Sequence, residues 1–219
     1  MNKAKVKDYF YKGYSILPKK LTTHIDIKRR NKYWKSQGMV FVHVPKNAGV
    51  SISKALYGRP LGHFYASDIR KTLKHTFEHS FSFGISRHPL DRIYSAYRFA
   101  LSGGEEMSFG GDNRLIKKLT FEEFIFEWLV FQDLSCIDGI FRPQHLYLCE
   151  SNEIIVKKVF KFDEIDSMQE FLSSVVGRNI IIPYANKTKR SKDIFVNHSR
   201  PLLQTIEEMY AKDFEVFGY

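Results

Sequence analysis

A short stretch near the start of the chain, MVFVHVPKNAGVSISKALYG at residues 39–58, most constrains the fold. Its apolar, β-branched beginning, closed by proline, is typical of a buried strand, and residues 49–58 read as a short helix. Strand, tight turn and helix together point backbone N–H groups at an anion. Gly49 lets the backbone come close, Ser51 adds a hydroxyl donor, and Lys46 adds a positive charge. We therefore expect a phosphate-binding loop. The GxxxxGK-S/T pattern is absent, and a plain strand-to-helix connection is the alternative.

The rest of the chain continues the alternation of strands and helices. We expect strands at 80–86 and 152–162, and helices at 66–73, 89–101, 120–132, 167–177 and 200–219. Thr120 with Glu123 forms a capping-box signature, and Gly177 is placed to stop a helix. Residues 102–113, with four glycines in twelve residues, are expected to form a mobile loop. This alternation favours an α/β fold with a parallel sheet and crossover helices.

A second expected strand-to-helix junction also carries cationic side chains. In GISRHPLDRIYSAYR (84–98), Arg87 follows the strand, and open α/β sheets bind ligands at the carboxyl ends of their strands. On the following helix, Arg92 and Ser95 lie three apart and share a face. Arg87 with Ser95 could bind a second phosphate by charge-assisted hydrogen bonds, and an amphipathic helix with solvent-facing arginines is the plainer alternative. Two such sites in one small domain imply a ligand with two phosphate-bearing ends.

Positive charge is concentrated at the beginning of the chain. The net charge is +10, and residues 1–36 contribute 11 Lys and Arg minus 2 Asp and Glu, which is +9. We therefore divide the chain into a basic N-terminal extension at 1–37 and a domain at 38–219. Such an extension can bind nucleic acid, an anionic membrane surface or a polyanionic substrate, or it can be a solvated segment.

Length and composition are those of a soluble globular protein. The 219 residues suit one domain with a sizeable core. No apolar run approaches the roughly 20 residues of a membrane span, and the N-terminus lacks the apolar region of a signal peptide. The two cysteines, Cys136 and Cys149, agree with a reducing compartment, and nothing requires a disulfide between them. We therefore expect a cytoplasmic location.

The two anion motifs together resemble those of sulfotransferases. PKNAGVS is similar to their 5′-phosphosulfate loop, and RHPLDRIYSAY matches every fixed position of their 3′-phosphate motif, R-x-P-x-x-R-x-x-S-x-Y. The segments GHFYASDIR, FRPQHLYL, FDEI, NKTKRS and YAKDFEVFGY also resemble the carbohydrate-type sulfotransferases (sulfotransferase family 2). That family includes bacterial members and the chondroitin 4-O- and heparan-sulfate 2-O-sulfotransferases. The similarity covers residues 39–219, and Val50 departs from it because the family usually has threonine there.

This resemblance implies a fold, a donor and a reaction. The fold is a P-loop-like three-layer α/β/α arrangement with a central parallel sheet. The donor is 3′-phosphoadenylyl sulfate (PAPS), whose 5′-phosphosulfate and 3′-phosphate account for two anion sites, and the product is adenosine 3′,5′-bisphosphate. The acceptor is a carbohydrate hydroxyl on an oligosaccharide, polysaccharide or lipid-linked glycan. No nucleic acid partner is expected, and residues 1–36 could hold the protein at a membrane surface.

The resemblance also assigns roles to residues. Lys46 stabilises charge on the leaving phosphate. The residues implied in donor binding are Lys46, Asn47, Ala48, Gly49, Val50, Ser51, Arg87, Ser95 and Arg190. Lysine and arginine supply the positive charge, so we expect no metal.

The acceptor hydroxyl needs a general base, and histidine has a suitable pKa. The candidates are His43, His63, His75, His79, His88 and His145. His43, inside a strand, is better explained as a core residue. His63 resembles the histidine of the Gly-His segment that carries the base in heparan-type relatives, so we prefer it to His145. Arg142, Gln144 and His145 are candidates for acceptor contact.

Two other functions stay open at this point. A small-molecule kinase also handles phosphates, although its usual loop and a metal-binding aspartate after an apolar strand are not evident. A non-enzymatic anion-binding module would explain the basic residues 1–36 but not the two phosphate motifs.

Overall fold

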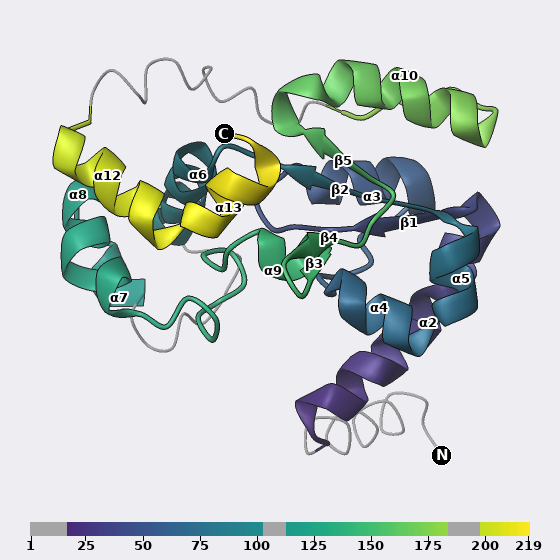
Figure 1. Cartoon of the computed structure of the whole chain (residues 1–219), viewed down its shortest axis with the longest axis horizontal. Helices are drawn as coiled ribbons and strands as arrows, with labels where there is room; N and C mark the ends of the chain where they lie inside the picture. The colour runs from purple at the N-terminus through teal and green to yellow at the C-terminus, as the bar shows by residue number, and fades with distance from the viewer. Residues whose placement is uncertain (1–16, 103–112, 184–197) are drawn as a thin grey trace, which may run out of the picture.

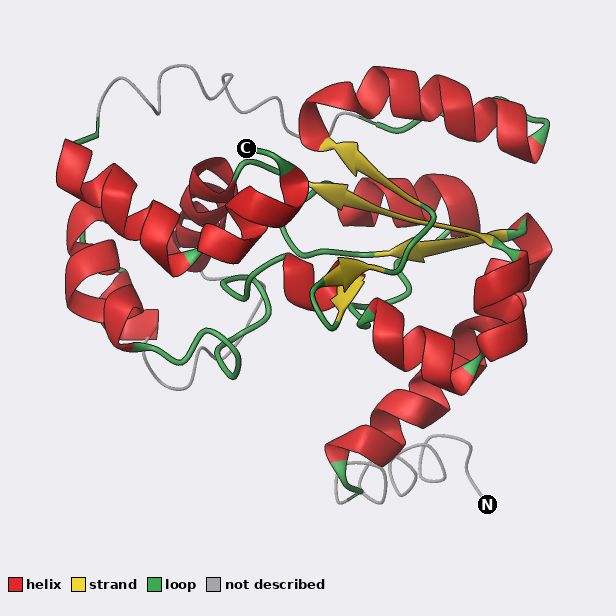
Figure 2. Cartoon of the chain, viewed as in Figure 1, coloured by secondary structure: helices red, strands yellow, loops and turns green. Residues whose placement is uncertain are grey.

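A three-stranded parallel sheet in the order β1-β2-β5 forms the centre of the protein. The structure is a computed structural model, and it describes residues 17–102, 113–183 and 198–219 (Figure 1). Strand β1 (Met39–Val42) pairs with β2 (Phe81–Ser86), and β2 pairs with β5 (Lys158–Lys161). Helices flank this sheet (Figure 2), so the predicted α/β fold with a central parallel sheet is confirmed.

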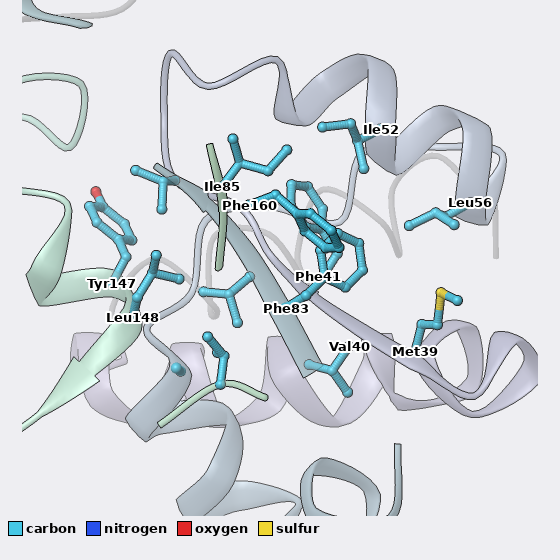
Figure 3. Packing of buried hydrophobic residues seen from close by; sticks show 14 of the residues in the cluster. Met39, Val40, Phe41, Ile52, Leu56, Phe83, Ile85, Tyr147, Leu148 and Phe160 are labelled. Atoms are coloured by element: carbon cyan, nitrogen blue, oxygen red, sulfur yellow. The ribbon is translucent and has the colours of Figure 1, made fainter. Parts of the chain in front are cut away.

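One face of the sheet carries a row of aromatic rings. Phe41 and Phe83 have ring centroids 5.0 Å apart, and Phe83 and Phe160 are 6.0 Å apart. Helices α3 (Gly49–Tyr57) and α10 (Ile165–Val176) contribute to the same core, and Figure 3 shows Ile52 and Leu56 of α3 beside these rings. Strands of a parallel sheet are usually buried on both faces, so their sequences are nearly continuous apolar stretches.

The opposite face packs against the short helix α9 (His145–Leu148). A Cβ atom on Gly84 would lie 2.3 Å from Leu148 Cδ2, so only glycine fits at this point of β2. Leu148 and Tyr147 lie on this side of the sheet in Figure 3. This close approach brings the residues just before α9 to the carboxyl ends of the strands.

The basic helix α2 (Lys19–Gln37) is part of the main core. Ile27 and Trp34 are 0% and 1% exposed and belong to the same apolar cluster as β1. Figure 1 shows α2 beside α4 (Ala66–Thr72) and α5 (Lys74–His79). The boundary that the charge distribution suggests between residues 37 and 38 therefore does not separate two independently packed parts, because α2 belongs to the main core. Residues 1–16 lie outside the described part.

A second apolar cluster lies beyond the carboxyl ends of the strands, toward which the arrows in Figure 2 point. It is built mainly from α6 (Pro89–Leu101), the helical segment at 121–131 and α12 (Arg200–Met209). The remaining elements are α7 (Asn113–Ile116), α8 (Phe121–Glu123), a π-helical turn (Phe124–Trp128), a 3₁₀ turn (Leu129–Phe131), β3 (Cys149–Glu150), β4 (Glu153–Ile154), a 3₁₀ turn (Phe162–Glu164) and α13 (Ala211–Phe217).

Several elements differ from the sequence-based expectation. The strand expected at 152–162 is two strands, because β4 pairs with β3 and only β5 joins the main sheet. The helix expected at 200–219 is two helices that meet at Tyr210. The loop expected at 102–113 lies almost wholly outside the described residues. Cys136 and Cys149 are both free. Among the described helices, none combines the length and the apolar character that crossing a membrane requires.

Candidate active site

The loop between β1 and α3 has the backbone conformation of an anion-binding turn. Lys46 and Ala48 have φ values of 70° and 57°, and Asn47 between them is not a positive-φ residue. Such alternation directs successive N–H groups to one side, as in backbone nests that bind anions. Helix α3 begins directly after this turn and has no side-chain cap, so its first N–H groups have no intrahelical or capping acceptor. The predicted strand, tight turn and helix are therefore present, and phosphate binding by this loop stays a prediction.

The side chains of this loop are placed differently from one another. Lys46 Nζ lies 3.9 Å from the centroid of the Phe99 ring on α6. Asn47 is only 1% exposed, and its Nδ2 donates to the Ile85 carbonyl (2.7 Å) beneath the loop. Val50, where the resemblance leads us to expect threonine, is 47% exposed. The Lys46 side chain, the backbone N–H groups and the half-buried Ser51 hydroxyl therefore remain as the groups that can face a ligand here, while the Asn47 side chain fixes the turn from below.

His43 lies directly beneath the start of α3. A Cβ atom on Gly49 would be 1.8 Å from His43 Cδ2, so the imidazole packs on the glycine backbone. Desolvation by burial lowers the pKa of His43 well below its ordinary value, and the neighbouring His63 lowers it further. Its buried Nδ1 has no hydrogen-bond partner among the described residues. His43 is thus a neutral, buried ring, as expected for a core residue, and it determines how the loop sits.

Replacing Gly49 with alanine is expected to be costly for this reason. The new methyl group would have to displace a buried ring that contacts His63, and overpacking of this kind costs about 1–3 kcal/mol. Urea unfolding would measure the loss. If the clash is the cause, shortening His43 to alanine in the same chain should give a non-additive result, with a coupling of about 0.5–3 kcal/mol. Strict additivity of the two substitutions would contradict this explanation.

His63 contacts the other side of the His43 ring. The centroids of the two imidazoles are 4.1 Å apart in an edge-on arrangement, so one ring separates His63 from Gly49. His63 is exposed to solvent, yet surrounding protein desolvates it enough to lower its pKa, and the negative charge of Asp138 opposes this effect. A histidine with a lowered pKa is neutral at neutral pH and can accept a proton.

The segment that carries His63 is held from α2. Gly62 has a φ of 101°, which favours glycine, and Arg30 Nε donates to the Leu61 carbonyl (3.0 Å) just before it. The basic helix thereby fixes the turn that presents His63.

Arg87 stands at the carboxyl end of β2 and reaches the first loop. Its Nη1 donates to the Lys46 carbonyl (3.3 Å), and its guanidinium carbon lies 4.4 Å from the Phe162 ring centroid. Its Nε is buried and has no partner among the described residues. Desolvation lowers the pKa of this guanidinium, and the carboxylates of Asp91 and Asp163 oppose the effect, but arginine stays charged. A buried cationic donor without an acceptor suits an anionic ligand.

The helix after Arg87 divides its polar residues between the core and the surface. Arg92 is 0% exposed and donates to the carbonyls of Ile140 (3.0 Å) and Arg142 (2.6 Å). Its interpretation as a solvent-facing arginine is therefore wrong, because its Nη1 and Nη2 atoms bond to the backbone of a buried turn. Ser95 is half-buried one turn further along α6.

The three residues expected to contact an acceptor have quite different surroundings. The Arg142 guanidinium donates to the Tyr65 hydroxyl (2.6 Å) and to the Ile137 and Cys136 carbonyls (2.5 and 3.0 Å). Gln144 is 0% exposed, and its side chain bonds both Asn47 and Arg87. These contacts favour structural roles for both residues.

His145 keeps part of its side chain accessible. Its Nδ1 lies 2.8 Å from the Asp213 carboxylate, which is completely buried. A carboxylate that accepts from Nδ1–H leaves Nε2 as a potential base. Asp213 was not singled out from the sequence, because nothing in the chain between His145 and the C-terminal helix indicates that the two meet.

Two expectations about the donor site stay predictions. Arg190 lies outside the described residues, so its contact with a nucleotide is a prediction from the sequence alone. Within the described residues, no group of three or more His, Cys, Asp and Glu side chains is arranged to hold a metal, and a metal-free reaction likewise stays a prediction.

Comparison with known proteins identifies the family. Residues 33–219 match the profile described as the sulfotransferase family. Neither the curated proteins nor the solved structures contain a significant match to this chain. The matched region runs from the end of α2 to the C-terminal helix. It includes His63 and the two candidate anion loops, which are the loop at residues 46–51 and the segment around Arg87 that follows β2. The chain therefore belongs to the sulfotransferase family.

Proposed function

We propose that this protein is a PAPS-dependent sulfotransferase that transfers a sulfuryl group to a hydroxyl of a carbohydrate. The contact that carries the proposal is Arg87 Nη1 to the Lys46 carbonyl, 3.3 Å, because it places the cation of the second motif against the loop of the first. Both motifs thus contribute to one site for a ligand with two anionic ends. Family membership supports sulfuryl transfer.

The residues present suit such a donor. The turn at 46–48 offers backbone N–H groups for the 5′ side, and Arg87 offers a buried guanidinium N–H for the 3′-phosphate. Ser51 and Ser95 would add hydroxyl donors, and Arg190 would add a further cation. When bound, PAPS supplies the activated sulfuryl group.

Each protein group has a separate task in the transfer. Backbone N–H groups of residues 47–51 would orient the donor, which converts an encounter into an aligned reaction. The Lys46 ammonium would stabilise negative charge on the leaving phosphate oxygen. His63 would take the proton from the acceptor hydroxyl, since its lowered pKa keeps it neutral. His145, oriented by Asp213, is the alternative base.

The choice of a carbohydrate acceptor rests on the sequence resemblance. The guanidinium of Arg142 is engaged by its own protein neighbours and Gln144 is buried, which makes His145 the best supported of the three candidates for acceptor contact. We further propose a cytoplasmic location, without a nucleic acid partner, and an acceptor that is an oligosaccharide, a polysaccharide or a lipid-linked glycan.

The donor site is tested by nucleotide binding. Adenosine 3′,5′-bisphosphate should stabilise the protein by about 2.7 kcal/mol at a hundredfold excess over Kd, without metal. The Arg87→Ala variant should lose this shift, since it lacks the cation of the 3′ site. Arg98→Ala is the matched control, because Arg98 is an exposed arginine on the following helix. A shift with ATP and Mg²⁺ alone would instead support a kinase, and no shift with any nucleotide would support an anion-binding module.

The exposed face of α2 is proposed to hold the protein at anionic surfaces. Lys28, Lys32 and Lys35 are all exposed and follow one helix face at i, i+4 and i+7 spacing. Changing all three to serine should weaken the free energy of binding to phosphatidylserine vesicles by about 1 kcal/mol for each lysine, as measured by sedimentation. High salt should abolish the difference between the variant and the wild type.

A control variant removes three exposed lysines elsewhere, Lys117, Lys118 and Lys157. It should sediment as the wild type does. If the α2 variant instead raises the KM of an anionic acceptor without changing sedimentation, the basic face serves the acceptor. Equal behaviour of both variants in both assays would contradict either role.

A further inference from the structure

The side chain of Gln144 joins the two anion loops to each other. Its Oε1 accepts from Asn47 Nδ2 (2.8 Å) in the first loop and from the Arg87 backbone N–H (2.9 Å) in the second. Its Nε2 donates to the Arg87 carbonyl (2.8 Å). Gln144 is 0% exposed, so all of these bonds are shielded from water. The pattern also fixes the orientation of the amide, because exchanging O and N would set donors against donors.

The sheet itself does not set the spacing of the two loops. Pairing of β1 with β2 ends at Val42 and Gly84, before either Lys46 or Arg87 is reached. Beyond this point, Asn47 Nδ2 donates to the Ile85 carbonyl and to Gln144 Oε1. These bonds join the segment after β1 to the end of β2. The amide pair therefore continues the connection where the ladder has stopped.

Gln144 is in turn fixed by the C-terminal helix. Its backbone N–H donates to Asp213 Oδ2 (2.8 Å), and the backbone N–H of His145 donates to Asp213 Oδ1 (2.8 Å). Asp213 is itself completely buried on α13. The tie from Asp213 through Gln144 to both loops is thus continuous and includes no exposed flexible group.

We infer that Gln144 is a positioning residue that sets the distance between the 5′ and 3′ anion sites. The inference rests on the proposed function, because the spacing matters only for a ligand that carries both anions. Such a ligand gains from its second end only when the two sites have a fixed separation, as in any linked binding event. The same tie holds the backbone that carries Lys46, and a displacement of about 1 Å at a catalytic group can cost about a hundredfold in rate.

The experiment separates binding of the two ends from binding of each end alone. Calorimetric titrations would use adenosine 3′,5′-bisphosphate, 5′-AMP and 3′-AMP, well below the unfolding temperature of each variant. In the wild type the bisphosphate should bind far more tightly than either mononucleotide. Gln144→Met keeps the volume but breaks the tie. It should weaken bisphosphate binding by about 10- to 100-fold while changing mononucleotide binding less than about threefold.

Two further variants keep the test decisive. Gln144→Leu removes the same side-chain bonds to Asn47 and Arg87 with a different apolar side chain and should give the same pattern, so it replaces Gln144→Met if that variant does not fold. Tyr210→Phe removes a buried hydrogen bond to the Phe141 carbonyl (2.7 Å) in the same region without touching the loops. It should leave the ratio of bisphosphate to mononucleotide affinity unchanged.

The possible failures differ from one another. If the wild type prefers the bisphosphate but both tie variants weaken all three ligands equally, or none, the inference is overturned and Gln144 is only a core residue. If the wild type shows no preference for the bisphosphate, the proposed function fails and the inference falls with it.

Discussion

Replacing Lys46 with methionine is expected to lower kcat by about 10²- to 10³-fold at saturating donor, with a change of only a few fold in affinity for adenosine 3′,5′-bisphosphate. The reason is that the ammonium acts on charge that develops on the leaving oxygen. The backbone strain at a φ of 70° is about the same for methionine as for lysine, because both are L-residues with a Cβ atom. It can also keep the contact with the Phe99 ring. The substitution therefore removes little besides the charge.

Lys54→Met provides the comparison for this variant. Lys54 is an exposed lysine on α3, and its removal changes the net charge equally. It should retain wild-type kcat. A Lys46→Met enzyme that raises KM and keeps kcat would show that the lysine contributes uniform binding instead of transition-state stabilisation, and this would contradict the proposed role.

Replacing His63 with alanine should reduce kcat/KM by about 10²- to 10⁴-fold, the usual range for a lost general base. A base must be unprotonated, so activity should fall as the pH drops through its pKa. Because desolvation lowers the pKa of His63, the midpoint of this acid limb should lie below the ordinary histidine value of about 6.5. A pH profile of kcat/KM between pH 5 and 8, roughly the range in which histidine changes charge, would measure it.

The alternative base gives this prediction its control. The His145→Ala enzyme should keep the acid limb, whereas the residual activity of the His63→Ala enzyme should lack it. The reverse result would assign the base to His145, which Asp213 holds through Nδ1 at 2.8 Å. Persistence of the limb in both single variants would exclude both assignments.

The sequence predicts best those elements whose ends carry local signals. Helix α6 begins and ends where expected, because Pro89 suits a first helical turn and the apolar pattern stops at Leu101. Thr120 and Glu123 form the expected capping box. The segment after it begins as an α-helix but continues as a π-helical and a 3₁₀ turn. In this region the rings of Phe124 and Phe141 both pack against Trp128.

Other elements depend on contacts between distant segments. The run at 152–162 is largely apolar, and only pairing with β3 on one side and β2 on the other divides it into two strands. Helix α2 was interpreted from its charge as an extension, whereas Ile27 and Trp34 anchor it in the core. Two buried side chains among many lysines give a weak periodic signal.

The same distinction holds within the candidate site. The loop at 46–51 and Arg87 could be predicted because each follows a strand directly, and helix starts and strand ends are local features. The buried bonds of Gln144 could not, since an amide side chain gives no indication of its partners. His43 was placed in the core by its strand, but its contact with Gly49 and His63 depends on how three segments converge.

The tie through Gln144 also has a consequence for the order of folding. It joins Asn47 to a residue 97 positions away, and Gln144 in turn to Asp213, 69 positions further on. Closing such long loops costs conformational entropy before any contact compensates it, so these bonds are expected to form late. A partly folded chain would possess the turn at 46–48 but not the spacing to Arg87. Hydrogen exchange at the Arg87 amide, which donates to Gln144, should then need only partial unfolding, at a lower free energy than exchange at the amides of the central strands. Ligand binding becomes a reporter of complete folding.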